Sequence, residues 1–530
     1  MSTIRFSRPW KAIASFFSDD SLTKKAYLNT IAAMLDYLSK LVVGFFLTPL
    51  MVNGLGDYFY GAWQVLNRLI GYISPTSGRP AQALRWTLAN KQSSTDYQQK
   101  REYVGSTLMV WLVFLPLIIV LGGVVSWYAP VWINSPVAYY PILRLASGIL
   151  VVNMIMTSLA TLPHSVLQGE NMGYKRMGLS TFLVFAGGGL TWLSLLFNTG
   201  IAGVAGAALI STILSGLFFF LVVKNYSPWF GVAIPSFKAA REFVGLSGWF
   251  VAWNLVMMMM NSSDVVLLGL LDAVERVTDY TLTKYAADTV ISMVAIIVFG
   301  IAPGLGGIIG AGDYARAARV RGEIMSITWL IITAVGATIL LWNRSFVSLW
   351  SGPEHYVGAF PTLLIVIVVS QFVVLRNDSN VIDVSLKLRN KVLLGLFSAT
   401  LSIIIAAVLV EFYNLGVVGI SLGLIIGRFI LSISYPVMVG RYLQIPLSNQ
   451  IKALARPLLV MAVLFFACYQ AEQARPAVLT ATNWLALAFG AGLTGLVALV
   501  TAYFVGLSRN QQNNLIRRVR AVFKTSPQRT

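Results

Sequence analysis

The chain has 530 residues, of which 57% are hydrophobic and only 11% are charged, and its formal net charge is +19. Soluble domains carry about 25% charged residues, so this composition excludes an ordinary soluble protein. Apolar residues occur in runs of about twenty, the length of a helix that crosses a bilayer, and not in the alternating ten-residue strands of a membrane barrel. The sequence therefore predicts an all-α integral membrane protein.

The N-terminal segment, residues 1–26, carries several basic residues but no apolar core of the kind that precedes a signal-peptidase site. Trp10, Ile13, Phe16 and Phe17 recur at helical spacing. This pattern predicts a short amphipathic helix on the cytoplasmic membrane surface, and a disordered basic tail is the alternative.

Cysteine and histidine are nearly absent, which bears on metal chemistry. Cys468 is the only cysteine, and His164 and His355 are the only histidines. We therefore predict no disulfide framework, no metal site and no bound cofactor. The sequence also lacks a G-x-x-x-x-G-K-[ST] nucleotide loop, and it suggests no catalytic residues.

Fourteen membrane spans are predicted along the chain. They lie near residues 27–50, 59–82, 104–128, 143–165, 177–197, 202–223, 243–270, 280–305, 325–343, 360–383, 391–410, 415–438, 456–471 and 482–506. With both termini in the cytoplasm, inner segments hold 30 of the 39 basic residues and outer segments hold only Arg276, Arg344 and Arg475. Short cytoplasmic loops are enriched in Lys and Arg, so this asymmetry predicts the orientation. It also explains most of the positive charge without nucleic acid, since anionic inner-leaflet lipids attract basic residues.

An internal repeat divides these spans. The first six begin near residue 27 and the next six near residue 243, an offset of about 215 residues. We therefore expect an N-lobe at 27–225, a C-lobe at 226–440, two further spans at 441–508 and a basic cytoplasmic tail at 509–530. Repeats of this kind place a transport site between the two halves.

Ionisable residues inside the predicted spans are the main candidates for function, because charges in the hydrocarbon are costly and normally face protein or water. The basic candidates are Lys40, Arg68, Arg144, Lys284, Arg376 and Arg428, and the acidic ones are Asp36, Asp264, Asp288, Asp378 and Asp383. Together they predict a net cationic cavity shared by the two lobes.

Some of these charges have a simpler explanation. Asp36 with Lys40, and Lys284 with Asp288, stand four residues apart and could neutralise each other on one helix face. Arg144, Arg376 and Asp383 lie close to span ends, where long side chains reach the headgroups. Arg68 and Arg428 have no acidic residue three or four positions away, and are therefore the strongest candidates for the cavity.

The seventh predicted span carries a polar stripe. Ser247, Asn254 and Asn261 recur every seven residues and Asp264 lies near the same face. A polar stripe cannot face lipid unsatisfied, so it indicates either a cavity lining or plain hydrogen bonding between helices.

Three short motifs resemble a known family. The segment 48–63, TPLMVNGLGDYFYGAW, resembles the P-x-x-x-x-x-LG-x-x-x-YG-x-W junction of polysaccharide flippases in the MOP (multidrug/oligosaccharidyl-lipid/polysaccharide) superfamily. The segment 167–173, LQGENMG, is similar to the family's LQG-x-N turn, and Asn261 and Asp264 leading to Tyr280 resemble its seventh-span pattern. The first motif is fairly specific and the other two are loose.

The resemblance implies a MATE-like fold of two six-helix lobes that translocates undecaprenyl-diphosphate-linked oligosaccharide, an O-antigen or exopolysaccharide repeat unit, across the bacterial inner membrane by alternating access. The candidate substrate-binding residues are Arg68, Arg428, Arg144, Lys40, Lys284, Arg376, Asn254 and Asn261. Asp36, Asp264 and Asp288 are candidates for exchanging H⁺ or Na⁺, and polysaccharide polymerase or assembly proteins are candidate partners. The alternatives are a MATE-like multidrug or cation antiporter and a membrane-embedded glycan polymerase or ligase.

Overall fold

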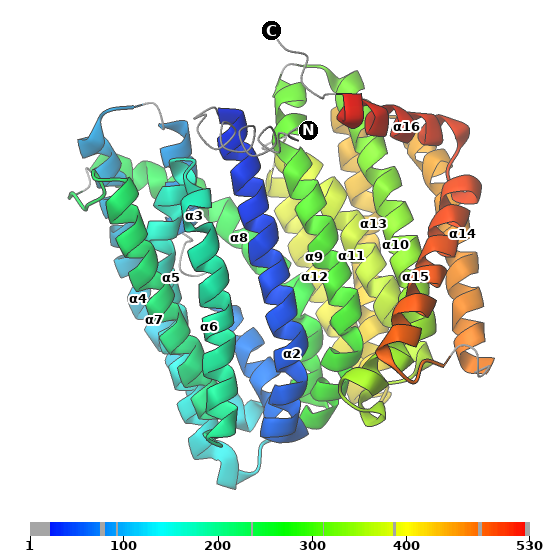
Figure 1. Ribbon diagram of the computed structural model, residues 1–530, viewed down its shortest axis with the longest axis horizontal. Helices are drawn as coiled ribbons and strands as arrows, with labels where there is room; N and C mark the ends of the chain where they lie inside the picture. The colour runs from blue at the N-terminus through cyan, green and yellow to red at the C-terminus, as the bar shows by residue number, and fades with distance from the viewer. Residues whose placement is uncertain are drawn as a thin grey trace, which may run out of the picture. The chain divides into compact units, whose positions relative to one another are not determined.

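The computed structural model describes residues 22–74, 80–91, 94–234, 237–310, 312–384, 388–474 and 480–524. All regular structure in these ranges is helical (Figure 1). Residues 1–21 of the predicted amphipathic segment lie outside the described residues, and α2 begins at Leu22.

The main helices follow the apolar runs of the sequence. They are α2 (Leu22–Gly71), α3 (Pro80–Asn90), α4 (Tyr97–Trp132), α5 (Tyr140–Gly169), α6 (Met177–Leu196), α7 (Gly200–Tyr226), α8 (Phe237–Leu271), α9 (Val274–Gly310), α10 (Tyr314–Trp350), α11 (Ala359–Val384), α12 (Leu388–Glu411), α13 (Gly416–Leu443), α14 (Leu447–Ala474), α15 (Trp484–Thr501) and α16 (Arg509–Lys524). A π-helix (Ala502–Gly506) follows α15.

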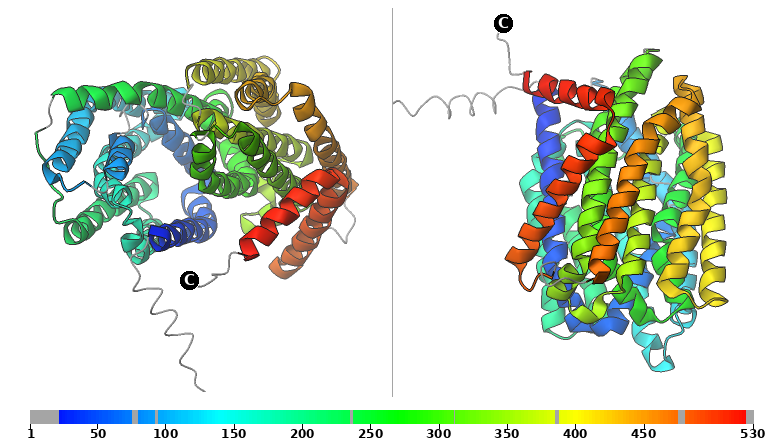
Figure 2. Two further views of the ribbon diagram at one scale, coloured as in Figure 1. Left: turned by 90° about the horizontal axis from the view of Figure 1, so that it is seen from above. Right: turned by 90° about the vertical axis from the view of Figure 1, so that its right-hand side faces the viewer.

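The chain forms two compact units, Met1–Asn254 and Leu255–Thr530, and the division falls within α8. In the second unit α10 packs against α9, α11, α14 and α15 (Figures 1 and 2). The predicted limits of the two lobes stay predictions.

Twelve of the described helices are long and apolar enough to cross a membrane, namely α2, α4 to α8 and α10 to α15. The protein is therefore a multi-pass, all-helical integral membrane protein. The first two predicted spans fall largely in α2, whose 50 residues form two helices that meet at a kink at Gly56. The predicted eighth span falls in α9, where most side chains beyond position 289 lie outside the described residues. Fourteen spans thus stay a prediction.

A glycine breaks α2 where the sequence suggested a loop between two spans. Gly56 has φ 76° and ψ 164°, a conformation essentially restricted to glycine. Gly56 is also the glycine of the LG pair in the junction motif. The motif therefore has a backbone role, since it permits a sharp change of direction without a long connecting loop.

Glycines also allow α12 and α13 to pack closely. A Cβ atom added to Gly423 would lie 2.4 Å from the backbone nitrogen of Ala406, and one added to Gly427 would lie 2.5 Å from the backbone of Ser402. Ser398 donates a hydrogen bond of 2.9 Å to the Gly427 carbonyl. Small residues four apart are typical of helix pairs in membranes, because they let two backbones approach.

We expect Gly423→Ala to lower the free energy of unfolding by about 1–3 kcal/mol, because the new methyl group can be accommodated only by separating α12 from α13. Gly492→Ala in α15 is the matched control, since its Cβ would meet nothing within 4 Å. Thermal unfolding of the purified variants measures the difference. Equal melting temperatures for the two variants would contradict the close packing.

In the first unit, the LQGEN segment at the end of α5 contacts both α3 and α4. Arg85 donates a hydrogen bond of 3.0 Å to Gln168, and a Cβ on Gly169 would lie 2.6 Å from the Cβ of Leu88. Lys100, which is 2% exposed, forms an ion pair of 2.8 Å with Glu170. Burial lowers the pKa of the Arg85 guanidinium below its usual range. The motif thus stabilises the junction of three helices.

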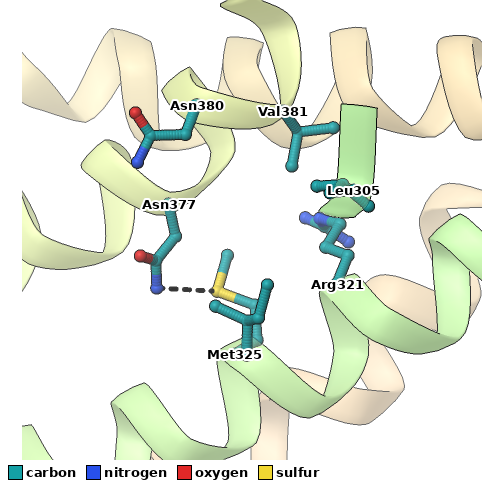
Figure 3. A pocket seen from close by; sticks show the side chains of 7 residues that line it. Leu305, Arg321, Met325, Asn377, Asn380 and Val381 are labelled. Atoms are coloured by element: carbon teal, nitrogen blue, oxygen red, sulfur yellow. Dashed lines mark hydrogen bonds between the residues drawn. The ribbon is translucent and has the colours of Figure 1, made fainter. Parts of the chain in front are cut away.

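The second unit has a corresponding ion pair. Arg321 near the start of α10 makes a bidentate contact with Asp378 of α11, with distances of 2.8 and 2.9 Å. Beside it, Arg321, Met325, Asn377 and Asn380 line a cavity of about 10 Å³, enough for about one water (Figure 3). Asp383, at the end of α11, pairs with Lys391 of α12. Asp378 and Asp383 therefore serve as partners of basic residues on neighbouring helices.

Candidate functional site

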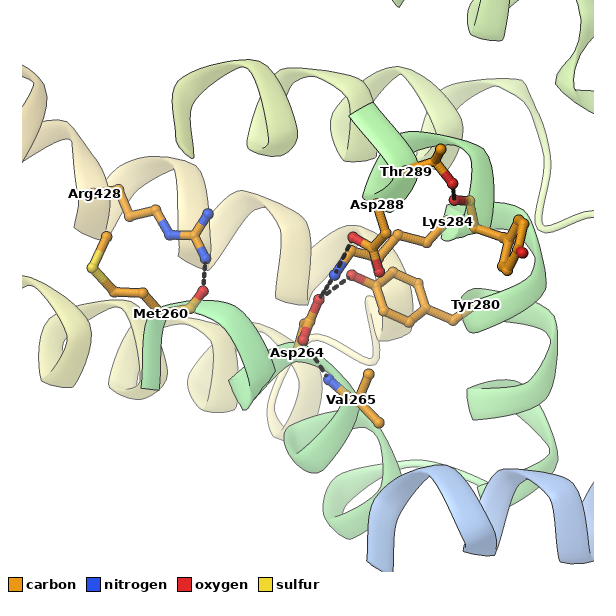
Figure 4. Close-up of polar contacts among 9 residues, drawn as sticks. Met260, Asp264, Val265, Tyr280, Lys284, Asp288, Thr289 and Arg428 are labelled. Carbon is orange, nitrogen blue, oxygen red and sulfur yellow. Dashed lines mark hydrogen bonds and ion pairs between the residues drawn. The ribbon is translucent and has the colours of Figure 1, made fainter. Parts of the chain in front are cut away.

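Asp264 of α8 is the centre of a buried polar cluster in the second unit. It is 3% exposed. One carboxylate oxygen accepts hydrogen bonds from the Tyr280 hydroxyl at 2.7 Å and from the Lys284 ammonium at 2.5 Å, and the other accepts from the Val265 amide at 2.8 Å (Figure 4). Three donors on two helices hold this carboxylate in one orientation.

The α8–α9 hairpin produces this arrangement from sequence spacing. Residues 272 and 273 join the two helices, and the Asp272 carboxylate accepts from the Ala273 amide at 2.8 Å and from Arg276 at 2.9 Å. Tyr280 and Lys284 are four residues apart on α9, so both reach the same side of the hairpin and meet Asp264.

Lys284 bridges two carboxylates. Its ammonium lies 2.5 Å from Asp264 and 3.3 Å from Asp288, with side-chain exposures of 7%, 4% and 42% for the three residues. The predicted pairing of Lys284 with Asp288 is present, but the buried and nearer partner is Asp264. Because the two carboxylates share one ammonium, the buried ion pair lies beside a more exposed carboxylate.

Arg428 of α13 is a second buried cation close to Asp264. It is 3% exposed, it donates a hydrogen bond to the Met260 carbonyl of α8, and its guanidinium lies 5.5 Å from the centre of the Phe372 ring. Its Nε has no hydrogen-bond partner among the described residues. A guanidinium has five donors, so Arg428 retains hydrogen-bonding capacity in a buried position.

The structure brings together four of the predicted site residues, namely Asp264, Lys284, Asp288 and Arg428 (Figure 4). Arg376 is half-buried on α11, and it donates to the Met257 sulfur at 3.2 Å. Along the polar stripe, Asn261 is exposed and Asp264 buried, so these two side chains do not share one environment.

The predicted residues of the first unit are described by themselves. Arg144 donates to the Trp127 carbonyl at 3.1 Å, and its guanidinium stacks 3.8 Å from the Trp127 ring and 5.3 Å from that of Tyr140. These contacts favour the interpretation of Arg144 as an anchor at a helix end. Asp36 and Arg68 are half-buried and Lys40 is exposed on α2, and Asn254 is half-buried on α8.

Sequence reasoning assigned no role to Tyr280, although its hydroxyl binds Asp264. Two features of the sequence could have indicated this role: Tyr280 stands four residues before Lys284 on the same helix, and it belongs to the seventh-span pattern. The hydrogen bond between Arg428 and the Met260 carbonyl could not be predicted from the sequence, because every residue has a backbone carbonyl.

A larger cavity, of about 300 Å³, lies where α9 and α13 begin. Arg276, Asp279 and Asn414 are among its lining residues. Its charged groups have partners nearby: Arg276 pairs with Asp272 at 2.9 Å, and the Asp279 carboxylate lies 2.9 Å from Nδ1 of His355, from which it accepts when that nitrogen carries the proton. The cavity is thus lined by satisfied polar groups, and the buried cluster around Asp264 is the better candidate for a transport site.

Comparison with known proteins supports the fold without supplying a sequence match. No protein-family model matches the chain, and no curated protein matches its sequence. A lipid II flippase, MurJ, in an inward closed conformation matches with a TM-score of 0.62 and 13% identity over 89% of this chain and 97% of its own.

Two further transporters of the MOP superfamily match as well. An inward-facing MATE family transporter of the MOP superfamily has a TM-score of 0.55 and 15% identity, covering 77% of this chain and 98% of its own. A MOP superfamily transporter from Pyrococcus furiosus, described as having a binding pocket of reversed polarity, has a TM-score of 0.55 and 14% identity over 79% and 96% of the two chains. The chain therefore has the fold of the MOP superfamily transporters.

Proposed function

We propose that this protein is a flippase that translocates undecaprenyl-diphosphate-linked oligosaccharide from the inner to the outer leaflet of a bacterial inner membrane. The buried pair of cations in the second unit is the observation that carries the proposal. Lys284 and Arg428 lie with Asp264 among α8, α9 and α13, all of which belong to membrane-spanning segments in the predicted topology.

The chemistry of a diphosphate suits these residues. A guanidinium presents a planar fork of donors that matches phosphate oxygens, and Arg428 has donor capacity beyond its bond to Met260. Lys284 is held by Asp264 and Asp288, so a phosphate would compete with carboxylates for the ammonium. Binding and release could then follow the exchange of one anionic partner for another.

The proposal includes the predicted topology of fourteen spans with both termini in the cytoplasm, and alternating access through a cationic cavity. Asp36, Asp264 and Asp288 are the proposed groups for H⁺ or Na⁺ coupling. The other proposed substrate contacts are Arg68, Lys40, Arg376, Asn254 and Asn261. Arg144 is a weaker member of this set because of its stacking on Trp127.

A MATE-like cation antiporter is the second candidate, and the buried carboxylate of Asp264 favours it. An organic cation would seek such a carboxylate. In this protein, however, Asp264 already binds the Lys284 ammonium and the Tyr280 hydroxyl, so a cationic substrate would first have to displace Lys284. A diphosphate can bind first at Arg428, whose Nε has no hydrogen-bond partner among the described residues, without displacing an ion pair.

Reconstitution into proteoliposomes tests the proposal. The vesicles would contain undecaprenyl-diphosphate-linked oligosaccharide labelled on the inner leaflet, and a membrane-impermeant lectin would report its arrival outside. We expect lectin capture to rise with time only when the protein is present. Ethidium export under an imposed H⁺ or Na⁺ gradient, without any lectin capture, would instead identify the antiporter.

A further inference from the structure

The C-terminal helix α16 is a strongly basic amphipathic helix. Its 16 residues include five basic ones, Arg509, Arg517, Arg518, Arg520 and Lys524, and no acidic one. Positions 515, 516, 519, 522 and 523 are apolar, and this spacing places them on one face of an α-helix with most of the basic positions opposite.

A capping box defines α16 as a helix separate from α15. The Gln511 side chain accepts a hydrogen bond of 2.8 Å from the Ser508 amide, and the Ser508 hydroxyl accepts from the Gln511 amide at 3.4 Å. This reciprocal arrangement is typical of a helix start. Figures 1 and 2 show that α16 turns away from α15 and lies across the end of α10, which it contacts.

Specific contacts fix the start of α16 to the ends of two membrane helices. Gln511 donates to the Ala453 carbonyl of α14 at 3.4 Å, and Gln512 donates to the Tyr503 carbonyl of the π-helix at 2.8 Å. Leu515 is 9% exposed. The orientation of α16 is therefore set by the protein and does not depend on a free tail.

Exposed cations and an exposed apolar side chain occur together at this end of the second unit. Ile516 is 38% exposed, and Arg517 beside it is exposed. Lys452, which precedes the Ala453 that α16 contacts, is also exposed. A surface with both apolar and cationic groups, at the end of membrane-spanning helices, is complementary to the boundary between acyl chains and anionic headgroups.

We propose that α16 is an interfacial helix that binds anionic phospholipid headgroups. The part of its apolar face that the protein leaves exposed, at Ile516, lies at the acyl boundary, and its basic positions contact the phosphates. Because Gln511 and Gln512 bind α14 and the π-helix after α15, lipid bound to α16 would hold the ends of both helices. This proposal is independent of what the protein transports.

Nanodiscs containing the full chain in phosphatidylglycerol or phosphatidylcholine test this inference. The readouts are the melting temperature and, after transfer to detergent, the phosphatidylglycerol retained per protein. We expect a higher melting temperature in phosphatidylglycerol for the natural chain. The variant R517Q/R518Q/R520Q/K524Q should lose that difference and retain less than half as much phosphatidylglycerol.

Two controls separate charge from structure and position. R517K/R518K/R520K keeps the charge and should behave like the natural chain. R316Q/R319Q removes exposed basic residues from the start of α10 and should also keep the lipid effect. Unchanged phosphatidylglycerol retention in the glutamine variant would overturn the proposal. Two measurements on the natural chain alone would also overturn it: equal retention of both lipids, or phosphatidylglycerol retention that 0.5 M salt does not reduce.

Discussion

Lys284→Met is expected to lower the free energy of unfolding by about 3–5 kcal/mol, because it removes the ammonium that neutralises a buried carboxylate. Asp264 would keep hydrogen bonds from Tyr280 and Val265, but its charge would be left uncompensated at 3% exposure. Most of the loss comes from Asp264, since Asp288 is more exposed and its carboxylate lies farther from the Lys284 ammonium. Denaturant unfolding of the purified variant measures the effect.

The double variant Asp264→Asn with Lys284→Met is the control for this prediction. It removes both charges and keeps a side chain that can accept from Tyr280, so it should recover much of the stability lost by Lys284→Met alone. If Lys284→Met unfolds at the same denaturant concentration as the natural chain, Lys284 and Asp264 do not form a significant buried ion pair.

Most helices could be predicted because the cost of exposing backbone polar groups to lipid forces apolar runs into helices. The predicted spans at 104–128, 143–165 and 202–223 lie within α4, α5 and α7. The kink within α2, which takes the place of a loop, could not be predicted, because hydropathy reports composition and not the backbone angles of a single residue. Gly56 alone, with its non-helical backbone angles, separates the two helical parts of α2.

The candidate site was partly predictable for an energetic reason. Charges within apolar segments are costly, so the sequence alone marks Asp264, Lys284, Asp288 and Arg428 as exceptional. It does not identify their partners on other helices. Spacing along one helix predicts Asp288 as a partner of Lys284, whereas the closer contact with Asp264 depends on how α8 and α9 pack.

Each unit has a buried ion pair at a similar place in the predicted internal repeat. Lys100 near the start of α4 pairs with Glu170 just after α5, and Arg321 near the start of α10 pairs with Asp378 on α11. Both members of the second pair follow the first at offsets close to that predicted for the repeat. Arg321 was expected in a cytoplasmic loop, but α10 begins at Tyr314, so the residue is helical and can reach Asp378.

Arg428→Ala is expected to reduce the rate of oligosaccharide-lipid translocation at least about tenfold, because it removes a buried guanidinium that would bind the diphosphate. Arg428→Lys keeps the charge but loses the planar fork, so it should retain an intermediate rate. Lectin capture in proteoliposomes, at matched protein content, measures these rates.

Arg441→Ala is the matched control, since Arg441 lies on the same helix α13 but is exposed, and its variant should translocate at the natural rate. Arg428 also binds the Met260 carbonyl, so a slow variant could simply be misfolded. Monodisperse elution and a melting temperature near that of Arg441→Ala would exclude that explanation. If a folded Arg428→Ala protein translocates as fast as Arg441→Ala, Arg428 does not bind the diphosphate, and the cationic site must be sought among the other basic residues of the spans.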